Sequence, residues 1–210
     1  PQNVFENLGF HYLGPIDGHD VHELVKLLRA CRTETDMPVL LHIITRKGKG
    51  YAPAEGDPER YHGLLPASAC NGEPPPADNG VTYTEIFSDA LHDLATADQR
   101  IVVISAAMCG GMGLTRFAQE HPERFVDVGI AEQHAVTCAG GMAARGLRPV
   151  VGIYSTFLQR AYDEIAHDVC LPHVPVLFAI DRAGLVGGDG KTHHGVFDIA
   201  YLRHLPGLRI

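Results

Sequence analysis

Short apolar runs alternate with helical stripes of apolar residues along the second half of the chain. Uninterrupted or alternating apolar runs predict buried strands, and apolar residues that recur every three or four positions predict helices. The predicted strands are residues 101–105, 125–130, 149–154 and 176–181. The predicted helices are residues 82–97, 114–120, 131–145 and 157–171. Because strands and helices alternate with short connections, we predict an α/β fold, a parallel sheet with helices on both faces.

The first of these helices illustrates how the pattern predicts burial. Its apolar residues gather on one face, which we expect to pack against the sheet. The members of this face are Ile86, Phe87, Ala90, Leu91 and Leu94.

The first 55 residues show the same pattern once, with a single helix and a single strand. Asp17 or Asp20 is predicted to cap a helix that ends near Arg32, and residues 39–45 form an almost continuous apolar run. Such a run is typical of a parallel strand buried on both faces. A helix followed by a strand is half of a crossover unit, so residues 1–55 are predicted to be the C-terminal part of a first, similar α/β domain.

Residues 56–80 separate the two predicted domains. They contain prolines at positions 58, 66, 74, 75 and 76, and they lack periodic apolar residues. We predict a linker here, followed by a second α/β domain at residues 81–210. The chain starts at Pro1 and stops at Ile210 within an expected strand or loop. We therefore expect a fragment whose second domain is incomplete at its C-terminus.

Composition narrows the classes of function. The 210 residues are 45% hydrophobic and 20% charged, and the formal net charge of −8 opposes binding to nucleic acid or an anionic membrane. No apolar run approaches the roughly 20 residues that a membrane span needs. The five cysteines form no Cys-x-x-Cys pair, which favours free thiols over a disulfide framework or a zinc knuckle. We expect a cytoplasmic protein without nucleic-acid or membrane partners.

Several side chains that can bind a ligand or take part in catalysis follow the carboxyl ends of the predicted strands. Glu132 follows the strand at 125–130, Tyr154 and Phe157 follow the next, and Arg182 and Asp189 follow the last. In open α/β sheets this edge is where ligands bind. Some of these residues also have a purely structural explanation. An acidic residue in the first turn complements the helix dipole, and an aromatic residue can belong to the core. Their gathering at one edge favours a binding site.

A basic glycine loop at residues 46–55 is a second candidate for ligand binding. Its glycines expose backbone N–H groups and Lys47 adds positive charge, so the loop has the means to hold a phosphate. It lacks the residue order of a P-loop, and a solvated basic loop is the alternative. His19 and His22 have the spacing of metal ligands but no third ligand nearby, so we predict no metal site there.

Ordered motifs make the chain similar to a known family. The first is Asp127-Val128-Gly129-Ile130-Ala131-Glu132-Gln133-His134-Ala135, and the second runs from Ile153-Tyr154-Ser155-Thr156-Phe157 to Asp163. The third joins Asp181-Arg182-Ala183-Gly184 to Asp189-Gly190-Lys191-Thr192-His193. With these motifs the chain resembles the 1-deoxy-D-xylulose-5-phosphate synthase family, transketolase-like enzymes that depend on thiamine diphosphate. The resemblance runs nearly from end to end, with one poorly matching stretch at residues 67–80.

The resemblance implies roles around the cofactor. It implies that Glu132 is the catalytic glutamate that hydrogen-bonds the pyrimidine ring of thiamine diphosphate, and that Phe157 stacks on this ring. It places Lys47 and Tyr51 at the rim of the cofactor's diphosphate site. It also implies that His62 reaches from the linker into the active site as a catalytic residue.

The resemblance further implies pyruvate and glyceraldehyde 3-phosphate as substrates. Both are anions, and the guanidinium group grips carboxylates and phosphates with paired hydrogen bonds. The implied substrate-binding residues are Tyr154, Arg160, Arg182, Asp189 and His193, and His193 is also implied to move protons. A structural salt bridge, with Asp163 or Asp181, is the alternative for each arginine.

The family's Mg²⁺ motif is not matched in this chain. The motif is Gly-Asp-Gly followed by Asn, whereas Gly188-Asp189-Gly190 does not directly follow a predicted strand and no Asn occurs after Asn79. We assign no metal ligand here and expect the magnesium ligands in a preceding N-terminal part. The resemblance implies a homodimer. Another transketolase-type enzyme, or a non-catalytic fragment that binds a partner chain, is the alternative. A nicotinamide-binding domain is disfavoured, because no Gly-x-Gly-x-x-Gly joins a first strand to a helix.

Overall fold

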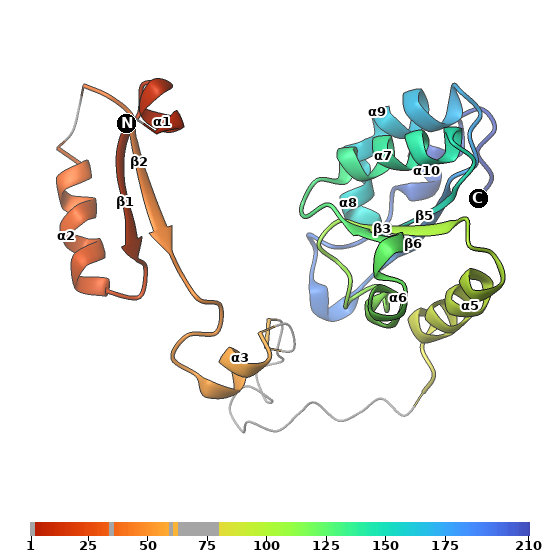
Figure 1. Ribbon diagram of the computed structural model, residues 1–210, viewed down its shortest axis with the longest axis horizontal. Coiled ribbons are helices and arrows are strands. Elements are labelled where there is room, and N and C mark those ends of the chain that lie inside the picture. The colour runs from red at the N-terminus through yellow and green to blue at the C-terminus, as the bar shows by residue number, and fades with distance from the viewer. Residues whose placement is uncertain (1–2, 34–35, 59–60, 63–79) are drawn as a thin grey trace. The chain divides into compact units, whose positions relative to one another are not determined.

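The computed structural model in Figure 1 describes residues 3–33, 36–58, 61–62 and 80–210. The chain divides into two units, Pro1–Glu73 and Pro74–Ile210. Most of the predicted linker at 56–80 lies outside the described residues.

The first unit contains a pair of parallel strands. Its elements are α1 (Val4–Asn7), β1 (His11–Asp17), α2 (Val21–Cys31), β2 (Val39–Ile44) and α3 (Ala52–Gly56). The predicted helix and strand are confirmed as α2 and β2, and Asp20 caps α2 by accepting a hydrogen bond of 3.0 Å from the Glu23 backbone N–H. Strand β1 was not predicted, because Gly14 and Pro15 interrupt its apolar pattern.

The expectation that β2 is buried on both faces is wrong. The second half of the strand is exposed, with Ile43 at 41% and Ile44 at 56% exposure. Among the described residues, its hydrogen-bonded neighbour is β1 alone, so β2 is an edge strand of a two-stranded sheet and not the interior strand that its apolar run suggested.

The second unit is built on a four-stranded parallel sheet with the order β4-β3-β5-β6. The strands are β3 (Ile101–Ser105), β4 (Phe125–Asp127), β5 (Arg148–Tyr154) and β6 (Leu177–Asp181). The central strand β3 is buried along its whole length, as its continuous apolar run predicts. The register brings the carboxyl ends level: Ser105 lies opposite Asp127, and Tyr154 lies opposite Asp181.

Helices cover both faces of this sheet, which confirms the predicted fold class. Figure 1 shows α5 (Tyr83–Ala97) and α6 (Thr115–Glu120) on one face, and α7 (Glu132–Ala144) on the other. A stripe of small residues allows α7 to pack closely, because Ala135, Ala139 and Ala143 share its inner face and are buried. The Thr82 side chain and Glu85 form a capping box that fixes the start of α5.

Three details of the predicted elements are corrected. In α5, Ile86 and Leu94 are 54% and 60% exposed, so its buried face is narrower than the apolar spacing suggested. Strand β4 ends at Asp127 rather than at residue 130, because the chain turns at Gly129, whose φ of 69° favours glycine. The predicted helix at 157–171 is a chain of short segments: α8 (Ser155–Leu158), η2 (Gln159–Ala161), α9 (Tyr162–Glu164) and the π-helical η3 (Ile165–Cys170).

The remaining elements are short. They are η1 (Pro122–Arg124), η4 (Gly187–Asp189) and α10 (Asp198–Leu202). None of the helices in the described ranges has the length and apolar character required to pass through a bilayer. Within those ranges, Cys31, Cys138 and Cys170 are free thiols.

Candidate active site

The carboxyl edge of the sheet is organised by Asp127, the last residue of β4. One of its carboxylate oxygens accepts hydrogen bonds of 2.9 Å from the backbone N–H groups of both Ala107 and Gly129. The first belongs to the glycine-rich loop after β3, and the second belongs to the turn that leads into α7. Asp127 therefore ties these two loops together and fixes the point at which α7 begins.

Glu132 is the first residue of α7 and points into the protein. Its side chain is 2% exposed. The Oε2 atom lies 3.3 Å from Nη1 of Arg160, in η2, whose side chain is 54% exposed. That contact does not have the direction of a hydrogen bond, and Oε2 is a buried acceptor without a hydrogen-bond partner among the described residues. Buried polar atoms are normally paired, so an unpaired carboxylate oxygen indicates a place for a ligand's donor group.

Aromatic rings form a second group at the same edge. The rings of Tyr154 and Phe157 stack with their centroids 5.8 Å apart, and His193 meets Phe157 edge-on at 5.4 Å. Two backbone hydrogen bonds of 2.8 Å between Gly184 and Gly195 close the loop that carries His193. The rings thus come from two segments of chain and offer an aromatic surface of the kind on which a planar heterocycle stacks.

Arg182 links this aromatic group to two carboxylates. Its guanidinium lies 5.0 Å from the centroid of the Tyr154 ring, and its Nε lies 3.0 Å from Oδ2 of Asp189. A longer contact of 3.7 Å joins it to Asp181, which also accepts a 2.9 Å hydrogen bond from the Thr84 hydroxyl. Arg182 therefore forms a structural ion pair with Asp181, the alternative raised from the sequence, and also pairs with Asp189. Arg160 pairs with Glu132 rather than with Asp163.

The hydroxyl of Tyr154 sits in a restricted space. Burial raises the pKa of Tyr154 above its ordinary value, although the positive charge of Arg182 acts to lower it. The hydroxyl therefore stays protonated near neutral pH and can donate a hydrogen bond. A Cβ at Gly111, in the loop after β3, would collide with this hydroxyl. The glycine at this position allows the loop to approach the tyrosine.

Of the predicted site residues, seven lie in the second unit and fall into two contact groups. The first group is Glu132 and Arg160, and the second is Tyr154, Phe157, His193, Arg182 and Asp189. Phe157 in α8 and Arg160 in η2 are three residues apart on consecutive helical segments, so the two groups are neighbours along the chain. The other predicted residues lie in the first unit: Lys47 and His62 are exposed, and Tyr51 makes an edge-on contact of 5.6 Å with Tyr61.

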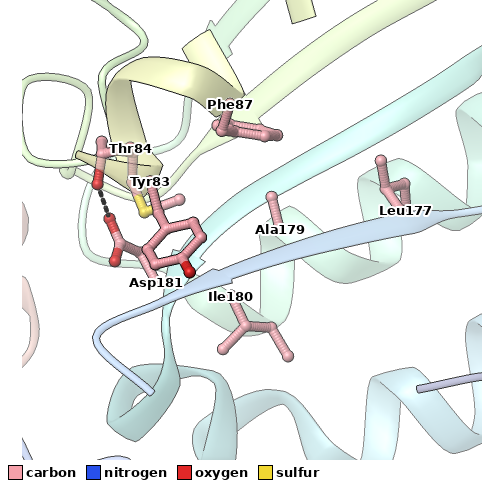
Figure 2. A pocket seen from close by; sticks show the side chains of 8 residues that line it. Tyr83, Thr84, Phe87, Leu177, Ala179, Ile180 and Asp181 are labelled. Carbon is pink, nitrogen blue, oxygen red and sulfur yellow. Dashed lines mark hydrogen bonds between the residues drawn. The ribbon is translucent and has the colours of Figure 1, made fainter. Parts of the chain in front are cut away.

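A cavity of about 410 Å³ opens elsewhere on the second unit, between the start of α5 and β6. Figure 2 shows its mainly apolar lining, which includes Phe87, Leu177 and Ile180, and the hydrogen bond from Thr84 to Asp181 at one end. It shares only Thr84 and Asp181 with the contacts described above. Because it lacks Glu132 and the stacked rings, we do not assign it as the active site.

The arrangement fits the pyrimidine half of thiamine diphosphate. That ring needs a hydrogen-bond acceptor at one nitrogen and an aromatic neighbour for its face. The residues present fit both needs, because Oε2 of Glu132 is a buried acceptor without a hydrogen bond among the described residues and Phe157 carries an aromatic ring at the same edge. Asp127 is a residue of this site that the sequence reasoning missed as a functional residue, although its place at the end of a strand, two residues before a glycine, was a usable signal.

Comparisons with known proteins agree with this geometry. The family described as "Transketolase, pyrimidine binding domain" matches residues 79–210, and the family described as "1-deoxy-D-xylulose-5-phosphate synthase" matches residues 1–45. The 1-deoxy-D-xylulose-5-phosphate synthase of Pelotomaculum thermopropionicum is 56% identical over 210 residues, which are 100% of this chain and 33% of that protein. The 1-deoxy-D-xylulose-5-phosphate synthase 1 of Geobacter sulfurreducens is 56% identical over 211 residues, with the same coverage of both chains.

A solved structure shows the same fold. The structure titled "Split gene transketolase, inactive beta4 tetramer" is 32% identical, with a TM-score of 0.53, and the match covers 61% of this chain and 41% of that one. The chain spans about a third of the length of the curated relatives it matches. From the matched families, the identity to these relatives and the geometry of the sheet edge, it follows that this chain belongs to the 1-deoxy-D-xylulose-5-phosphate synthase family of transketolase-type, thiamine-diphosphate-dependent enzymes.

Proposed function

We propose that this chain is part of an enzyme that condenses pyruvate with glyceraldehyde 3-phosphate, giving 1-deoxy-D-xylulose 5-phosphate and CO₂. This product is a precursor of isoprenoids, thiamine and pyridoxal. The observation that carries the proposal is the buried carboxylate of Glu132, whose Oε2 has no hydrogen bond among the described residues, in a chain that matches a pyrimidine-binding domain. The relatives named as this synthase support the choice of reaction.

Glu132 has the central role in the proposal. Thiamine diphosphate, when bound, supplies the nucleophilic carbon that accepts the acyl unit of a 2-oxo acid. Oε2 of Glu132 would hydrogen-bond the pyrimidine ring and share a proton with it, in a site that excludes water. Phe157 would keep the ring in place by stacking. Lys47 and Tyr51 would lie along the cofactor's diphosphate.

The substrate anions would be held by the two arginines. Arg160 has a half-exposed guanidinium, which leaves it free to turn from Glu132 towards a substrate carboxylate or phosphate. Arg182 is fixed by Asp189 and Tyr154, so it would present a rigid fork to the phosphorylated aldehyde. His193, which is partly buried beside Phe157, would exchange protons with the acceptor oxygen, and His62 is the other histidine that we propose to be catalytic.

The proposal also includes Mg²⁺, a homodimer and a cytoplasmic location. Magnesium prefers oxygen ligands, and Asp189 is already paired with Arg182, so we place no magnesium ligand at that residue. A second chain is supported by the large apolar side chains exposed near the site, Ile130 at 76% and Leu185 at 80%. The free thiols of Cys31, Cys138 and Cys170 support a reducing compartment.

The reaction can be tested with the full-length protein that contains this chain. We expect CO₂ release from pyruvate to require thiamine diphosphate, Mg²⁺ and an aldehyde acceptor, with glyceraldehyde 3-phosphate preferred over larger sugar phosphates and lipoamide. A preference for a ketose donor would reassign the protein to another transketolase-type activity. Absence of turnover with every donor and acceptor pair, in folded protein loaded with cofactor, would support the non-catalytic alternative.

A further inference from the structure

Two histidines and a glutamate converge away from the active site. His92 lies on α5, Glu120 is the last residue of α6, and His121 is the residue that caps α6. The ligand-type atoms of the three side chains all lie within 4.8 Å of one another. Among the described residues this is the one group of three or more His, Cys, Asp or Glu side chains with such spacing.

The polar atoms of this group are poorly satisfied by the protein. Nδ1 of His92 and Nε2 of His121 are both shielded from solvent, and neither has a hydrogen-bond partner among the described residues. Nδ1 of His92 is 2.8 Å from Oε2 of Glu120, yet the direction of this contact is not that of a hydrogen bond. Two neighbouring histidines that each carry a buried nitrogen without a hydrogen bond, beside one carboxylate, are an arrangement that suits a shared cation.

The surroundings hold the three side chains in place. The imidazole rings of His92 and His121 stack with their centroids 5.9 Å apart, and Phe117 packs edge-on against His121 at 5.1 Å. The other oxygen of Glu120, Oε1, accepts a 3.1 Å hydrogen bond from Arg116. Such outer contacts orient metal ligands and strengthen binding.

We propose that His92, Glu120 and His121 bind a zinc ion, or a similar divalent transition metal, that bridges α5 and α6. Two imidazoles and one carboxylate form a ligand set known for zinc, with the fourth position left to water. Zinc bonds of about 2.0–2.2 Å place tetrahedral ligand atoms roughly 3.4 Å apart, so small side-chain rotations suffice to close the site. The nitrogen ligands disfavour Mg²⁺ and Ca²⁺, which prefer oxygen.

This site is separate from the carboxyl edge that carries Glu132. Three residues after His121, the guanidinium of Arg124 donates to the backbone carbonyls of Ala95 and Ile101, at 2.9 and 3.4 Å. Ile101 is the first residue of β3, so this region lies towards the amino ends of the strands. Zinc bound here would tie two helices together on the face of the sheet opposite α7.

The test is a titration of the 210-residue chain with zinc chloride, in competition with a chromophoric zinc chelator. We expect one site that is weakened at least ~10-fold by His92→Gln and by His121→Gln, because each removes a ligand. The matched control is His167→Gln. His167 lies 3.8 Å from a carboxylate oxygen of Asp168 but belongs to no group of three ligands among the described residues, so this variant should bind zinc like the parent chain.

A second variant and a second readout guard against misfolding. Glu120→Gln leaves both stacked rings in place, and it too should weaken zinc binding. Zinc should raise the melting temperature of the parent and of His167→Gln, and this rise should shrink in the other three variants. If the affinity changes by less than twofold in His92→Gln, His121→Gln and Glu120→Gln, or falls equally in His167→Gln, the zinc site does not exist.

Discussion

Replacement of Glu132 by glutamine is expected to make the chain more stable while removing the carboxylate that we propose to be catalytic. The Glu132 side chain is 2% exposed, and its Oε2 has no hydrogen-bond partner among the described residues. A buried polar atom left unpaired costs about 1–3 kcal/mol. The pair with Arg160, whose guanidinium is half exposed, returns at most about 1 kcal/mol. Glutamine keeps a polar group at nearly constant volume but removes its charge, and a charge costs more to bury than an amide, so we expect a net gain of about 1 kcal/mol.

Urea unfolding of the 210-residue chain, followed by circular dichroism, measures this difference. The midpoint should rise in Glu132→Gln with an unchanged slope, and the melting temperature should rise by roughly 2–5 °C for a domain of this size. Glu164→Gln is the matched control, because Glu164 also has a buried, unpaired Oε2 but belongs to neither contact group of the site. A loss of 1 kcal/mol or more in Glu132→Gln would refute the reasoning, since it would mean that the carboxylate stabilises the fold instead of awaiting a ligand.

Three further predictions concern neighbouring features of the second unit. Gly140→Ala should destabilise the chain by ~1–3 kcal/mol, because the added Cβ would lie 2.6 Å from the Asp168 carbonyl oxygen. Gly141→Ala, which has open space around the added Cβ, should stabilise α7 by ~0.5–1 kcal/mol. Urea unfolding midpoints that shift in the same direction in both variants would contradict this prediction. Asp127→Ala should lower the free energy of unfolding by about 2 kcal/mol, because it removes the acceptor of two backbone N–H groups. An unchanged urea unfolding midpoint would show that the two loops keep their conformation without this side chain. Arg182→Lys in the full-length protein should raise KM for the phosphorylated aldehyde about tenfold and leave KM for pyruvate nearly unchanged, which steady-state kinetics can check.

The sheet of the second unit could be predicted from the sequence because its apolar runs are continuous. Ile101–Ser105 is buried throughout, and a continuous run with short flanking turns is the strongest signal for a parallel strand. Strand β1 escaped prediction because Gly14 and Pro15 break its pattern, and the shortened β4 reflects a glycine turn that periodicity does not register. Strand ends were therefore less predictable than strand cores.

Only those features of the candidate site that follow from the order and direction of the strands could be predicted from the sequence. Because the strands are parallel, Tyr154 and Asp181 end at the same edge, and Phe157 and Arg182 follow them into it. The ion pair between Arg182 and Asp189 depends on how one loop folds back, and no local spacing reveals it. The same holds for His92 and His121, which are far apart in the sequence and meet only because α5 and α6 pack together.

The central claim is that the buried carboxylate of Glu132 shares a proton with the cofactor's pyrimidine ring, and one measurement tests it most directly. The rate of CO₂ release from pyruvate, with glyceraldehyde 3-phosphate as acceptor, should be compared in full-length Glu132→Ala and Glu164→Gln proteins saturated with thiamine diphosphate and Mg²⁺. We expect Glu132→Ala to lose at least ~100-fold in kcat, as for removal of a proton-transfer group, and Glu164→Gln to keep the parent rate. Near-normal turnover by Glu132→Ala would contradict the account.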